Sequence, residues 1–398
     1  MIFEYPLEGR TVMARPKVAI ITPGSFPIPS ARSSSVERVV EQVIPLARDR
    51  LHCVIFGRSA KHLPSYGTVH GVPCYRVPYG NGARYIQAVI RQLLLLKPDV
   101  IQVENRPRYV LSIKKRMPRA RIFLSLHSTT YISRAVIPEK MLRRSLQCAD
   151  CIMVNSLFLK EYLVRRYHEL GAKIFVNHLG VNVEQFEPRW SEGGNHKRME
   201  WLHRQGLAGR KIILFVGRLK PQKGVHHLLE SMRSIASLEP SAILVIVGSA
   251  FYGSNRRTAY VRKLEKMAKR IPRHVRFVPY VPYDEIARWF NISDVVVVPS
   301  SKNEAFGLVN VEAMAAGVPV IAANAGGIRE IVQHGVTGYL ANPSQLAKEL
   351  VSYIVHVLRD SALQLRLGLG GAYRAQQNFT WQHTADRWAE RVEQILSR

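Results

Sequence analysis

The sequence predicts an α/β protein built from two Rossmann-like domains, each a doubly wound parallel sheet covered by helices. At 398 residues the chain is too long for one ordinary hydrophobic core and suits two domains of this class. Short apolar runs of strand length alternate with helix-periodic segments over most of the chain, which is typical of parallel sheets with helices between the strands. A polar stretch at 186–210 interrupts this alternation, which then begins again.

The first half of the chain carries seven strand-like runs. They are expected at 17–22, 53–56, 72–77, 100–103, 121–126, 151–154 and 174–176. Helices are expected between them at 36–50, 83–96, 110–117 and 139–147. The segment 36–50 shows the basis of this assignment, because its apolar residues recur at the spacing of one helix face. Ser35 can cap its N-terminus, and Glu37 falls in its first turn.

The second half repeats the pattern. Strands are expected at 211–216, 242–247, 275–278, 295–298 and 319–323, and helices at 225–238, 258–270, 283–290, from near Gly307, and over much of the chain from 344 to a last helix at 382–396. The strands 295–298 and 319–323 are each followed by a polar or glycine-rich turn and a helix, as in nucleotide-binding domains. Ligands of such sheets bind beyond the carboxyl ends of the strands, so we expect the site in the cleft between the domains.

The composition is that of a globular protein, with 47% hydrophobic and 22% charged residues. No apolar run reaches the ~18 residues that a membrane-spanning helix needs. The N-terminal segment carries Glu4 and Glu8 where a signal peptide has a basic start, so we expect a cytoplasmic protein. Cys148 and Cys151 form one C-x-x-C without a second ligand pair at zinc spacing, which favours ordinary buried thiols over a metal or redox site.

The formal net charge of +28 is unusual. Residues 1–180 contain 28 Lys and Arg against 11 Asp and Glu, and the remainder contains 29 against 18. Such a field attracts anionic partners, which include phosphorylated ligands, anionic lipid surfaces and nucleic acid. A solvated basic surface without a dedicated partner explains the charge equally well. Nucleic acid is not an expected partner, because the chain has no nucleic-acid-binding motif and its aromatic residues are not interleaved with the basic clusters.

The turn after the strand 211–216 combines glycines with cations. Gly217, Arg218, Lys223 and Gly224 stand between this strand and the next helix. Glycine lets the backbone approach a ligand closely, and a helix N-terminus offers free N–H groups and a partial positive charge. The turn therefore suits a diphosphate, although it lacks the Walker pattern of ATPases. A solvated basic turn is the alternative.

Three other polar residues are candidates because of their placement. Glutamates eight residues apart occur four times in this chain, so that spacing alone decides nothing. Glu304, however, follows a buried strand directly before a helix, and Glu312 lies about one turn inside this helix beside small residues. A partly buried carboxylate needs a partner, and ribose hydroxyls in the cleft would serve. His127 ends the strand 121–126 and faces the same cleft, where it either binds substrate or is satisfied by local backbone.

The chain resembles family 4 of the glycosyltransferases, which are retaining enzymes with two Rossmann-like domains in the GT-B arrangement. Four motifs carry the resemblance and together span nearly the whole chain. They are Glu304–Glu312 (EAFGLVNVE, the family's E-x₇-E), Gly217-Arg218-Leu219 with Lys223-Gly224, Gly180-Val181-Asn182 through Phe186, and Gly326-Gly327 with Glu330. The resemblance implies an acceptor-side domain at 1–185 and a nucleotide-sugar-binding domain at 186–381. The C-terminal helix, about 382–398, would complete the first domain.

The resemblance also implies roles for individual residues. Arg218 and Lys223 would bind the donor diphosphate and stabilise the departing nucleoside diphosphate, which suits a site without a metal-ligand cluster. Glu312 would bind the ribose, Glu304 the transferred sugar, and His127 would lie over this sugar near the reacting carbon. The predicted catalytic residues are Glu304, His127, Arg218 and Lys223, and the predicted donor-binding residues are Gly24, Gly217, Arg218, Lys223, Glu304, Phe306, Gly307, Leu308 and Glu312.

Backbone groups are expected to contribute as well. The N–H groups of Phe306, Gly307 and Leu308 would lie near the sugar and the phosphates. The family often has a Gly-Gly pair in the loop after the first strand, where this chain has Ser33-Ser34-Ser35. Serine disfavours positive φ, so a close approach of this backbone to substrate is less expected, and Gly24 is the candidate to supply it.

The resemblance implies a mechanism and a type of acceptor. A double displacement needs a carboxylate nucleophile beside the anomeric carbon, and the motifs provide no obvious one. Front-face substitution is therefore favoured, with a UDP- or GDP-sugar as donor and no metal or other cofactor. Glu104–Pro107 and Phe186–Trp190 are similar to spore-coat-associated glycosyltransferases of endospore-forming bacteria. This implies a cell-envelope or spore-coat glycan or a lipid-linked acceptor, with the basic first domain held against an anionic membrane or the protein placed in the spore coat.

Three other functions stay open. A GT-B protein that has lost turnover would serve as a scaffold or coat component, and UDP or GDP would not stabilise it against unfolding. A nucleic-acid binder, suggested by charge alone, would bind RNA or DNA with a steep salt dependence. A nucleotide-sugar epimerase of related architecture would convert the donor without an acceptor.

Overall fold

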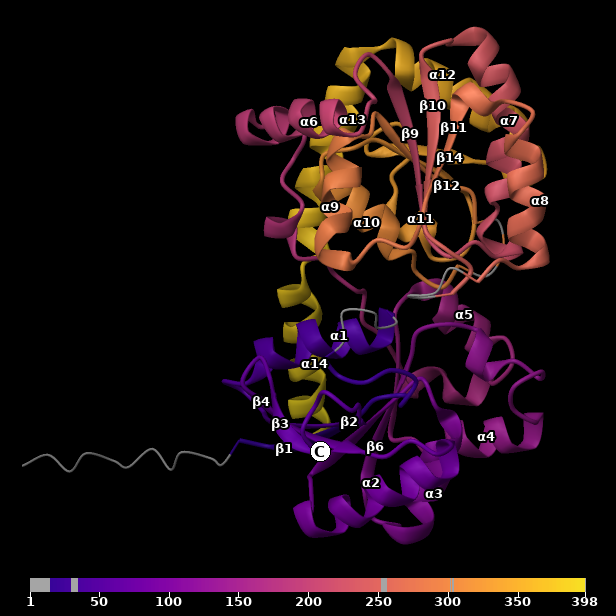
Figure 1. The fold of residues 1–398 in the computed structure, drawn as a ribbon. Helices are drawn as coiled ribbons and strands as arrows, with labels where there is room; N and C mark the ends of the chain where they lie inside the picture. The colour runs from indigo at the N-terminus through magenta and orange to yellow at the C-terminus, as the bar shows by residue number, and fades with distance from the viewer. Residues whose placement is uncertain (1–14, 30–34, 252–255, 301, 303, 398) are drawn as a thin grey trace, which may run out of the picture.

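The computed structural model describes residues 15–29, 35–251, 256–300, 302 and 304–397. Within these residues the strands form two separate sheets with helices packed around them (Figure 1). The first sheet has eight strands in the order β3-β4-β2-β1-β5-β6-β7-β8, and the second has six in the order β11-β10-β9-β12-β13-β14. The prediction of two doubly wound α/β domains is confirmed.

The first sheet and its helices come from the first half of the chain. The strands are β1 (Lys17–Ile21), β2 (His52–Arg58), β3 (Tyr66–Val69), β4 (Val72–Val77), β5 (Val100–Glu104), β6 (Arg121–Leu126), β7 (Cys151–Val154) and β8 (Ile174–Val176). The helices are α1 (Ser35–Val43), α2 (Gly82–Leu96), α3 (Pro107–Arg116), α4 (Glu139–Cys148) and α5 (Leu157–Val164), with 3₁₀ turns η1 (Ile44–Ala47), η2 (Thr130–Ile132), η3 (His168–Lys173) and η4 (Val183–Gln185).

The second sheet and its helices follow. The strands are β9 (Lys211–Val216), β10 (Ala242–Val247), β11 (Val275–Val278), β12 (Val295–Val298), β13 (Val320–Ala323) and β14 (Gly338–Ala341). The helices are α6 (Glu192–Arg204), α7 (Val225–Leu238), α8 (Ala259–Ala268), α9 (Tyr283–Ile292), α10 (Leu308–Ala315), α11 (Ile328–Ile331), α12 (Leu346–Arg359), α13 (Ser361–Asn378) and α14 (Trp381–Leu396), with 3₁₀ turns η5 (Pro221–Lys223), η6 (Pro272–His274) and η7 (Pro343–Gln345).

Several details differ from the sequence predictions, and besides β3 they include the helix α5 and the strand β14, which were not predicted. The strand β3, which was not predicted, pairs antiparallel with β4, so a purely parallel first sheet is wrong at this edge. His70 and Gly71 join the two strands with φ of +46° and +84°, which suits the tight turn of a hairpin. The helix predicted at 36–50 ends as an α-helix at Val43 and continues as η1, where Pro45 lacks the N–H that the next α-helical hydrogen bond needs.

In each sheet the strand order reverses beside the first strand. β9 lies between β10 and β12, and β1 lies between β2 and β5, with all these pairs parallel. Sheets of this type bind ligands beyond the carboxyl ends of the strands at such a switch point. The chain leaving β9 contains Arg218 and Lys223, and the chain leaving β12 contains Glu304. The predicted donor-binding turns therefore stand at the switch point of the second sheet.

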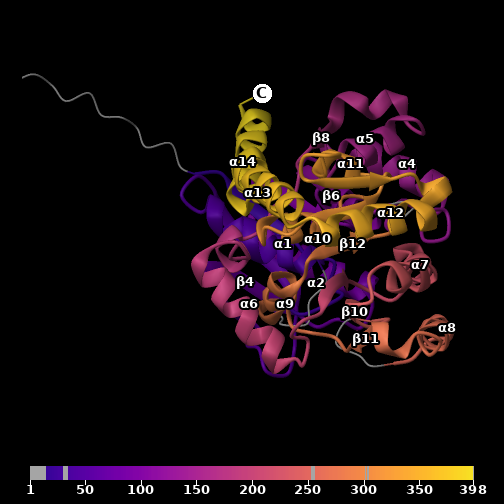
Figure 2. The ribbon, with the colours of Figure 1, turned by 90° about the horizontal axis from the view of Figure 1, so that it is seen from above.

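The last helix returns to the first sheet. Figures 1 and 2 show α14 leaving the second domain and running beside α1, against which it packs. The indole N–H of Trp388 donates to Gln102 of β5 at 2.6 Å, and Glu393 accepts from Arg50 at 2.5 Å. The residues at which one domain ends and the other begins stay a prediction.

Candidate active site

Two turns meet at the switch point of the second sheet, one from β9 to α7 and the other from β12 to α10. Gly224 lies where they touch, because its φ is +73° and a Cβ there would lie 2.0 Å from the carbonyl oxygen of Pro299. Only a residue without a side chain permits two backbones to approach so closely. Gly217, which follows β9 and has φ of +149°, opens the first of these turns. The contact places Lys223 beside Glu304.

Lys223 and Glu304 form an ion pair with 2.5 Å between Nζ and Oε2. Their side chains are 29% and 16% exposed. Burial disfavours the charged carboxylate, but the charge and hydrogen bond of Lys223, aided by the charge of Arg218, outweigh it and hold the pKa of Glu304 below its ordinary value. Glu304 is therefore ionised at neutral pH, which suits it to accept hydrogen bonds from sugar hydroxyls rather than to donate a proton.

The glycine-rich turn after β13 holds the backbone of Glu304. The N–H of Gly327 donates to the Glu304 carbonyl at 2.9 Å, and a Cβ on Gly326 would lie 2.1 Å from the same oxygen. The neighbouring Phe306 has a buried ring that stacks on His178 with 5.9 Å between ring centroids. The ring of Phe306 is thus occupied by packing, and only its backbone can contact a ligand.

The helix α10 begins directly after this turn. Gly307 precedes it with φ of +98°, and no side chain caps the N–H groups of its first turn, which starts at Leu308. Such N–H groups carry the partial positive charge of a helix N-terminus. The position agrees with the predicted role of these backbone groups beside sugar and phosphates, which stays a prediction.

Glu312 is buried one turn into α10, with 5% of its surface exposed. Its Oε1 lies 3.9 Å from a guanidinium nitrogen of Arg38 in α1, and Tyr283 of α9 hydrogen-bonds to it. The Arg38 guanidinium also stacks 3.5 Å above the Tyr283 ring. Burial raises the pKa of Glu312 in spite of these two partners. Sequence reasoning missed Arg38 and Tyr283, because neither belongs to a motif and both are distant in the chain.

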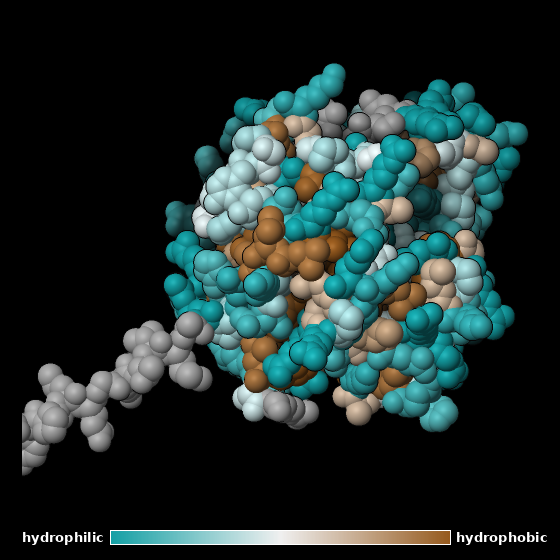
Figure 3. Space-filling view, turned by 90° about the horizontal axis from the view of Figure 1, so that it is seen from below, coloured by the Kyte–Doolittle hydropathy of each residue, from teal (hydrophilic) through white to brown (hydrophobic). Residues whose placement is uncertain are grey.

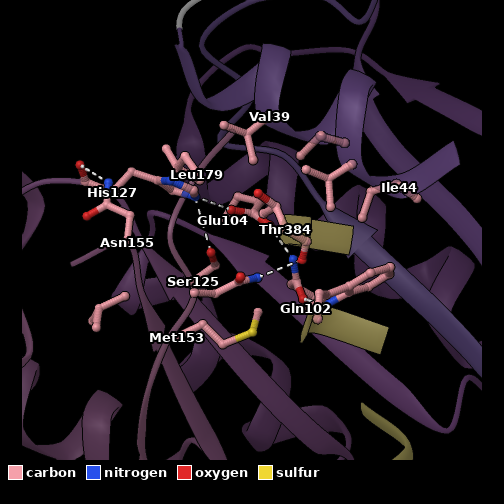
Figure 4. Close-up of a pocket in the computed structure, with 15 residues that line it drawn as sticks. Val39, Ile44, Gln102, Glu104, Ser125, His127, Met153, Asn155, Leu179 and Thr384 are labelled. Carbon is pink, nitrogen blue, oxygen red and sulfur yellow. Dashed lines mark hydrogen bonds and ion pairs between the residues drawn. The ribbon is translucent and has the colours of Figure 1, made fainter. Parts of the chain in front are cut away.

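His127 lies in the first domain at the carboxyl end of β6. Its Nε2 is 2.7 Å from Oε2 of Glu104 and 3.1 Å from Oγ of Ser125 (Figure 4). Gln102 donates to the other oxygen of Glu104 at 2.5 Å and accepts from Trp388. These side chains line a cavity of about 30 Å³ between α1, the sheet and α14. It has room for about two water molecules, so it is not the donor pocket.

Gly24 follows β1 in the first domain. Its φ is +73°, and a Cβ would lie 2.9 Å from the ring of Tyr79. Packing against this ring already requires glycine, and a donor-binding role for Gly24 stays a prediction. Ser33 and Ser34, and the side chain of Ser35 that was expected to cap α1, lie outside the described residues.

The glutamate of the fourth motif connects the two domains. Glu330 of α11 accepts hydrogen bonds from the backbone N–H groups of Leu157 and Phe158, at 2.7 and 2.9 Å, and lies 2.8 Å from Nε2 of His178. Its carboxylate thus covers the N-terminus of α5, where a negative charge is favoured. The sequence marked Glu330 only as part of a motif, because Leu157 and Phe158 belong to a helix that was not predicted.

The remaining features concern cysteines, metals and membrane spans. Cys148 and Cys151 are free thiols, and burial raises the pKa of Cys151, which opposes the thiolate that a redox site needs. The described part of the chain holds no group of three or more His, Cys, Asp or Glu side chains arranged for a metal ion. Nor does any helix in that part have both the length and the apolar character for crossing a bilayer.

Two Rossmann-like domains, with an E-x₇-E turn set against a glycine-rich basic turn at the switch point, define a glycosyltransferase of the GT-B fold. Residues 36–185 match the family model Glycosyltransferase Family 4, and residues 199–372 match Glycosyl transferases group 1. Spore coat protein SA of Bacillus subtilis is 31% identical over 373 residues, which cover 93% of this chain and 97% of that protein. The chain belongs to glycosyltransferase family 4.

Solved structures show the same fold. HepE of Anabaena, crystallised with UDP-glucose, superposes with a TM-score of 0.75 at 21% identity, over 96% of this chain and 100% of the other. Sucrose-phosphate synthase of Thermosynechococcus elongatus gives a TM-score of 0.76 at 22% identity, also over 96% of this chain and 100% of the other. The predicted GT-B architecture and transferase class are thus confirmed, whereas the roles of individual site residues stay predictions.

Proposed function

We propose that this glycosyltransferase moves a hexosyl group from a UDP- or GDP-sugar to a glycan or lipid-linked acceptor, with retention of configuration and without a metal. The observation that carries the proposal is the Lys223–Glu304 pair beside Arg218 at the switch point of the second sheet. The carboxylate accepts hydrogen bonds from sugar hydroxyls, and the cations attract the diphosphate. The binding of UDP-glucose by HepE supports this choice of donor.

The cations also have a role in the reaction step. As the bond between the sugar and the diphosphate breaks, negative charge grows on the leaving phosphate. Arg218 and Lys223 are placed to stabilise that charge, because the stabilisation of developing charge by fixed cations lowers the barrier directly. Lys223 can approach the phosphate while it stays beside Glu304, since an ammonium group has three N–H donors.

Front-face substitution agrees with the ion pairs and hydrogen bonds of Glu304, Glu312 and Glu104. A double displacement needs a carboxylate that is free to attack the anomeric carbon. Glu304 is paired with Lys223, and Glu312 is buried against Arg38. Both oxygens of Glu104 are occupied, one by Gln102 and the other by His127. In the proposed step the leaving phosphate therefore takes the proton of the acceptor hydroxyl while the new bond forms on the same face.

Transfer assays with a panel of UDP- and GDP-sugars test the proposal. The anomeric coupling constant of the product, read by NMR, reports the stereochemistry, and we expect retention with or without EDTA. Glu304→Gln should lower turnover without forming an adduct. A covalent glycosyl-enzyme trapped in this variant, or an inverted product, would refute the front-face mechanism. A folded protein that turns over no donor would be a scaffold, and one that converts the donor without an acceptor would be an epimerase.

We further propose an acceptor of the cell envelope or the spore coat, reached at an anionic membrane surface. The similarity to spore coat protein SA supports the first part. The charge of the first domain supports the second. Seen from below, the molecule is mostly hydrophilic with a central apolar patch (Figure 3). On α2, Leu94 and Leu95 are 47% and 78% exposed, and the adjacent α3 ends in Lys114, Lys115 and Arg116.

A further inference from the structure

Glu104 is a buried carboxylate that the proposed reaction does not use. It ends β5, and its side chain is 2% exposed. Gln102 donates to Oε1 at 2.5 Å, and His127 lies 2.7 Å from Oε2 through its Nε2. A buried carboxylate is retained only where partners satisfy both oxygens. Here one of the two partners is the histidine that the sequence predicts to lie over the donor sugar.

The contact with Glu104 determines which nitrogen of His127 carries the proton. A carboxylate oxygen accepts hydrogen bonds, so in this arrangement Nε2 of His127 donates to Oε2 of Glu104. In a neutral imidazole the other nitrogen then has no proton and is an acceptor. Nδ1 of His127 is buried and has no hydrogen-bond partner among the residues that the structure describes. A buried nitrogen without a partner is unfavourable, so Nδ1 needs a donor from outside the chain, either a water molecule or a substrate hydroxyl.

The C-terminal helix supports this arrangement. An indole N–H can only donate, so Trp388 of α14 holds the carbonyl oxygen of the Gln102 amide toward itself at 2.6 Å. The NH₂ group of Gln102 must then face Glu104. Trp388 thus orients Gln102. Gln102 in turn orients Glu104, and Glu104 orients His127 (Figure 4).

We propose that Glu104 is a positioning residue, which holds His127 in the Nε2–H form with Nδ1 as the acceptor for a substrate hydroxyl. The proposal rests on the proposed function for the identity of the substrate, but the state of the imidazole can be measured without it. Glu104 touches no substrate in this role. It acts by keeping one tautomer and one ring orientation in place.

The substitution Glu104→Gln tests the proposal sharply, because it preserves shape and reverses one donor. The NH₂ of Gln102 can only be paired by the carbonyl oxygen of the new amide, so the new NH₂ faces Nε2 of His127. Nε2 must then accept, and the proton moves to Nδ1. A substrate hydroxyl that donates to Nδ1 in the natural protein loses its acceptor, and we expect kcat to fall on the order of 10²-fold with the nucleotide Kd unchanged.

A second substitution should reverse this effect. Trp388→Phe removes the donor that fixes Gln102, so its amide can turn in the double variant Glu104→Gln/Trp388→Phe. The new amide then presents its oxygen to Nε2 again, and we expect kcat to recover at least about tenfold over Glu104→Gln. Glu393→Gln is the matched control, because it replaces a glutamate of α14 that pairs with Arg50. Its kcat should equal that of the natural protein.

The ¹⁵N chemical shifts of the His127 ring, assigned by comparison with His127→Asn, give the direct readout. We expect a protonated Nε2 and a bare Nδ1 in the natural protein, the reverse in Glu104→Gln, and a return to the first pattern in the double variant. A proton on Nδ1 in the natural protein would overturn the proposal. So would a loss of kcat in Glu104→Gln that the second substitution does not restore. If no donor is turned over, the proposed function fails, and the ring shifts still decide the role of Glu104.

Discussion

The two glutamates of the E-x₇-E motif differ because each has its own neighbours. Lys223 stands 2.5 Å from Glu304 and lowers its pKa, whereas burial raises the pKa of Glu312 although Arg38 is near. The motif spacing carries no information about either partner. A role as acceptor for sugar hydroxyls suits the ionised Glu304, and ribose hydroxyls would give the buried Glu312 further hydrogen-bond partners.

Replacing Lys223 by Met should change how activity depends on pH. Without the ammonium group, burial dominates and the pKa of Glu304 rises, so Glu304 becomes protonated at a higher pH. If transfer needs ionised Glu304, the acid limb of kcat/KM moves to higher pH. At neutral pH we also expect kcat/KM to fall on the order of 10²-fold, because the variant lacks a cation that would stabilise the leaving phosphate. Initial rates between pH 5 and pH 8 give both results.

Lys220→Met is the control for this experiment. Lys220 lies in the same turn, with its ammonium group 5.9 Å from the ring centroid of Phe251. Its removal should leave the acid limb where it is. An acid limb that is equally unmoved in Lys223→Met would show that the Lys223–Glu304 pair does not set the state of the carboxylate during turnover.

At the scale of elements, the fully buried strands could be predicted from the sequence almost to the residue. The strands 211–216, 242–247 and 295–298 coincide with β9, β10 and β12. A strand covered on both faces is an unbroken apolar run, so its ends are visible in the sequence. β3 was missed because an exposed edge strand such as Tyr66–Val69 needs no such run. The same limit applies to the site, where the motifs located Glu304 and Arg218 but not the partners supplied by folding.

Gly224→Ala should separate the two turns that meet at the site. The new Cβ would lie 2.0 Å from the Pro299 carbonyl oxygen, and the left-handed φ is unfavourable for alanine. Together we expect a loss of about 2 to 4 kcal/mol in the free energy of unfolding, with weaker stabilisation by UDP or GDP. Chemical denaturation with and without nucleotide measures both.

Gly206→Ala separates backbone strain from the clash. Gly206 has a similar φ of +63°, but nothing lies within 4 Å of its Cβ position. In this variant the free energy of unfolding should fall by only about 1 kcal/mol, and UDP or GDP should stabilise it as much as the natural protein. Equal losses in both variants would mean that the contact between the turns is unimportant for the site.

On the scale of the whole molecule, polar side chains help to connect the two domains. Glu330 accepts two backbone N–H groups of α5 and contacts His178, and Glu312 contacts Arg38 of α1. Glu330→Ala leaves the N-terminus of α5 without this partner. We therefore expect the free energy of unfolding to fall by about 2 to 3 kcal/mol and the two domains to lie further apart. Denaturation and small-angle X-ray scattering measure the two effects. Glu161→Ala, in the exposed part of the same helix, should change neither, and an unchanged radius of gyration in Glu330→Ala would contradict the inference.

The basic charge of the first domain leads us to predict that the protein binds anionic membranes. Leu94 and Leu95 are exposed on α2, and Lys115 and Arg116 on the neighbouring α3 are exposed as well. Apolar side chains that enter the headgroup region strengthen membrane binding. Basic residues near an anionic surface add about 1 kcal/mol of binding free energy for each charge. We expect the protein to sediment with vesicles that contain phosphatidylglycerol and to be released as salt screens the charges.

The apolar part of this membrane contact can be tested separately from the charge. Leu94→Ser with Leu95→Ser keeps the net charge, so the loss of vesicle binding in this variant would come from the leucines alone. Leu365→Ser with Leu369→Ser is the matched control, since these leucines are 38% and 51% exposed on α13, away from the basic first domain. We expect the first pair to weaken binding about tenfold or more and the second pair to leave it unchanged. Equal binding by both variants would mean that charge attraction alone holds the protein at the membrane and that the leucines of α2 do not enter it.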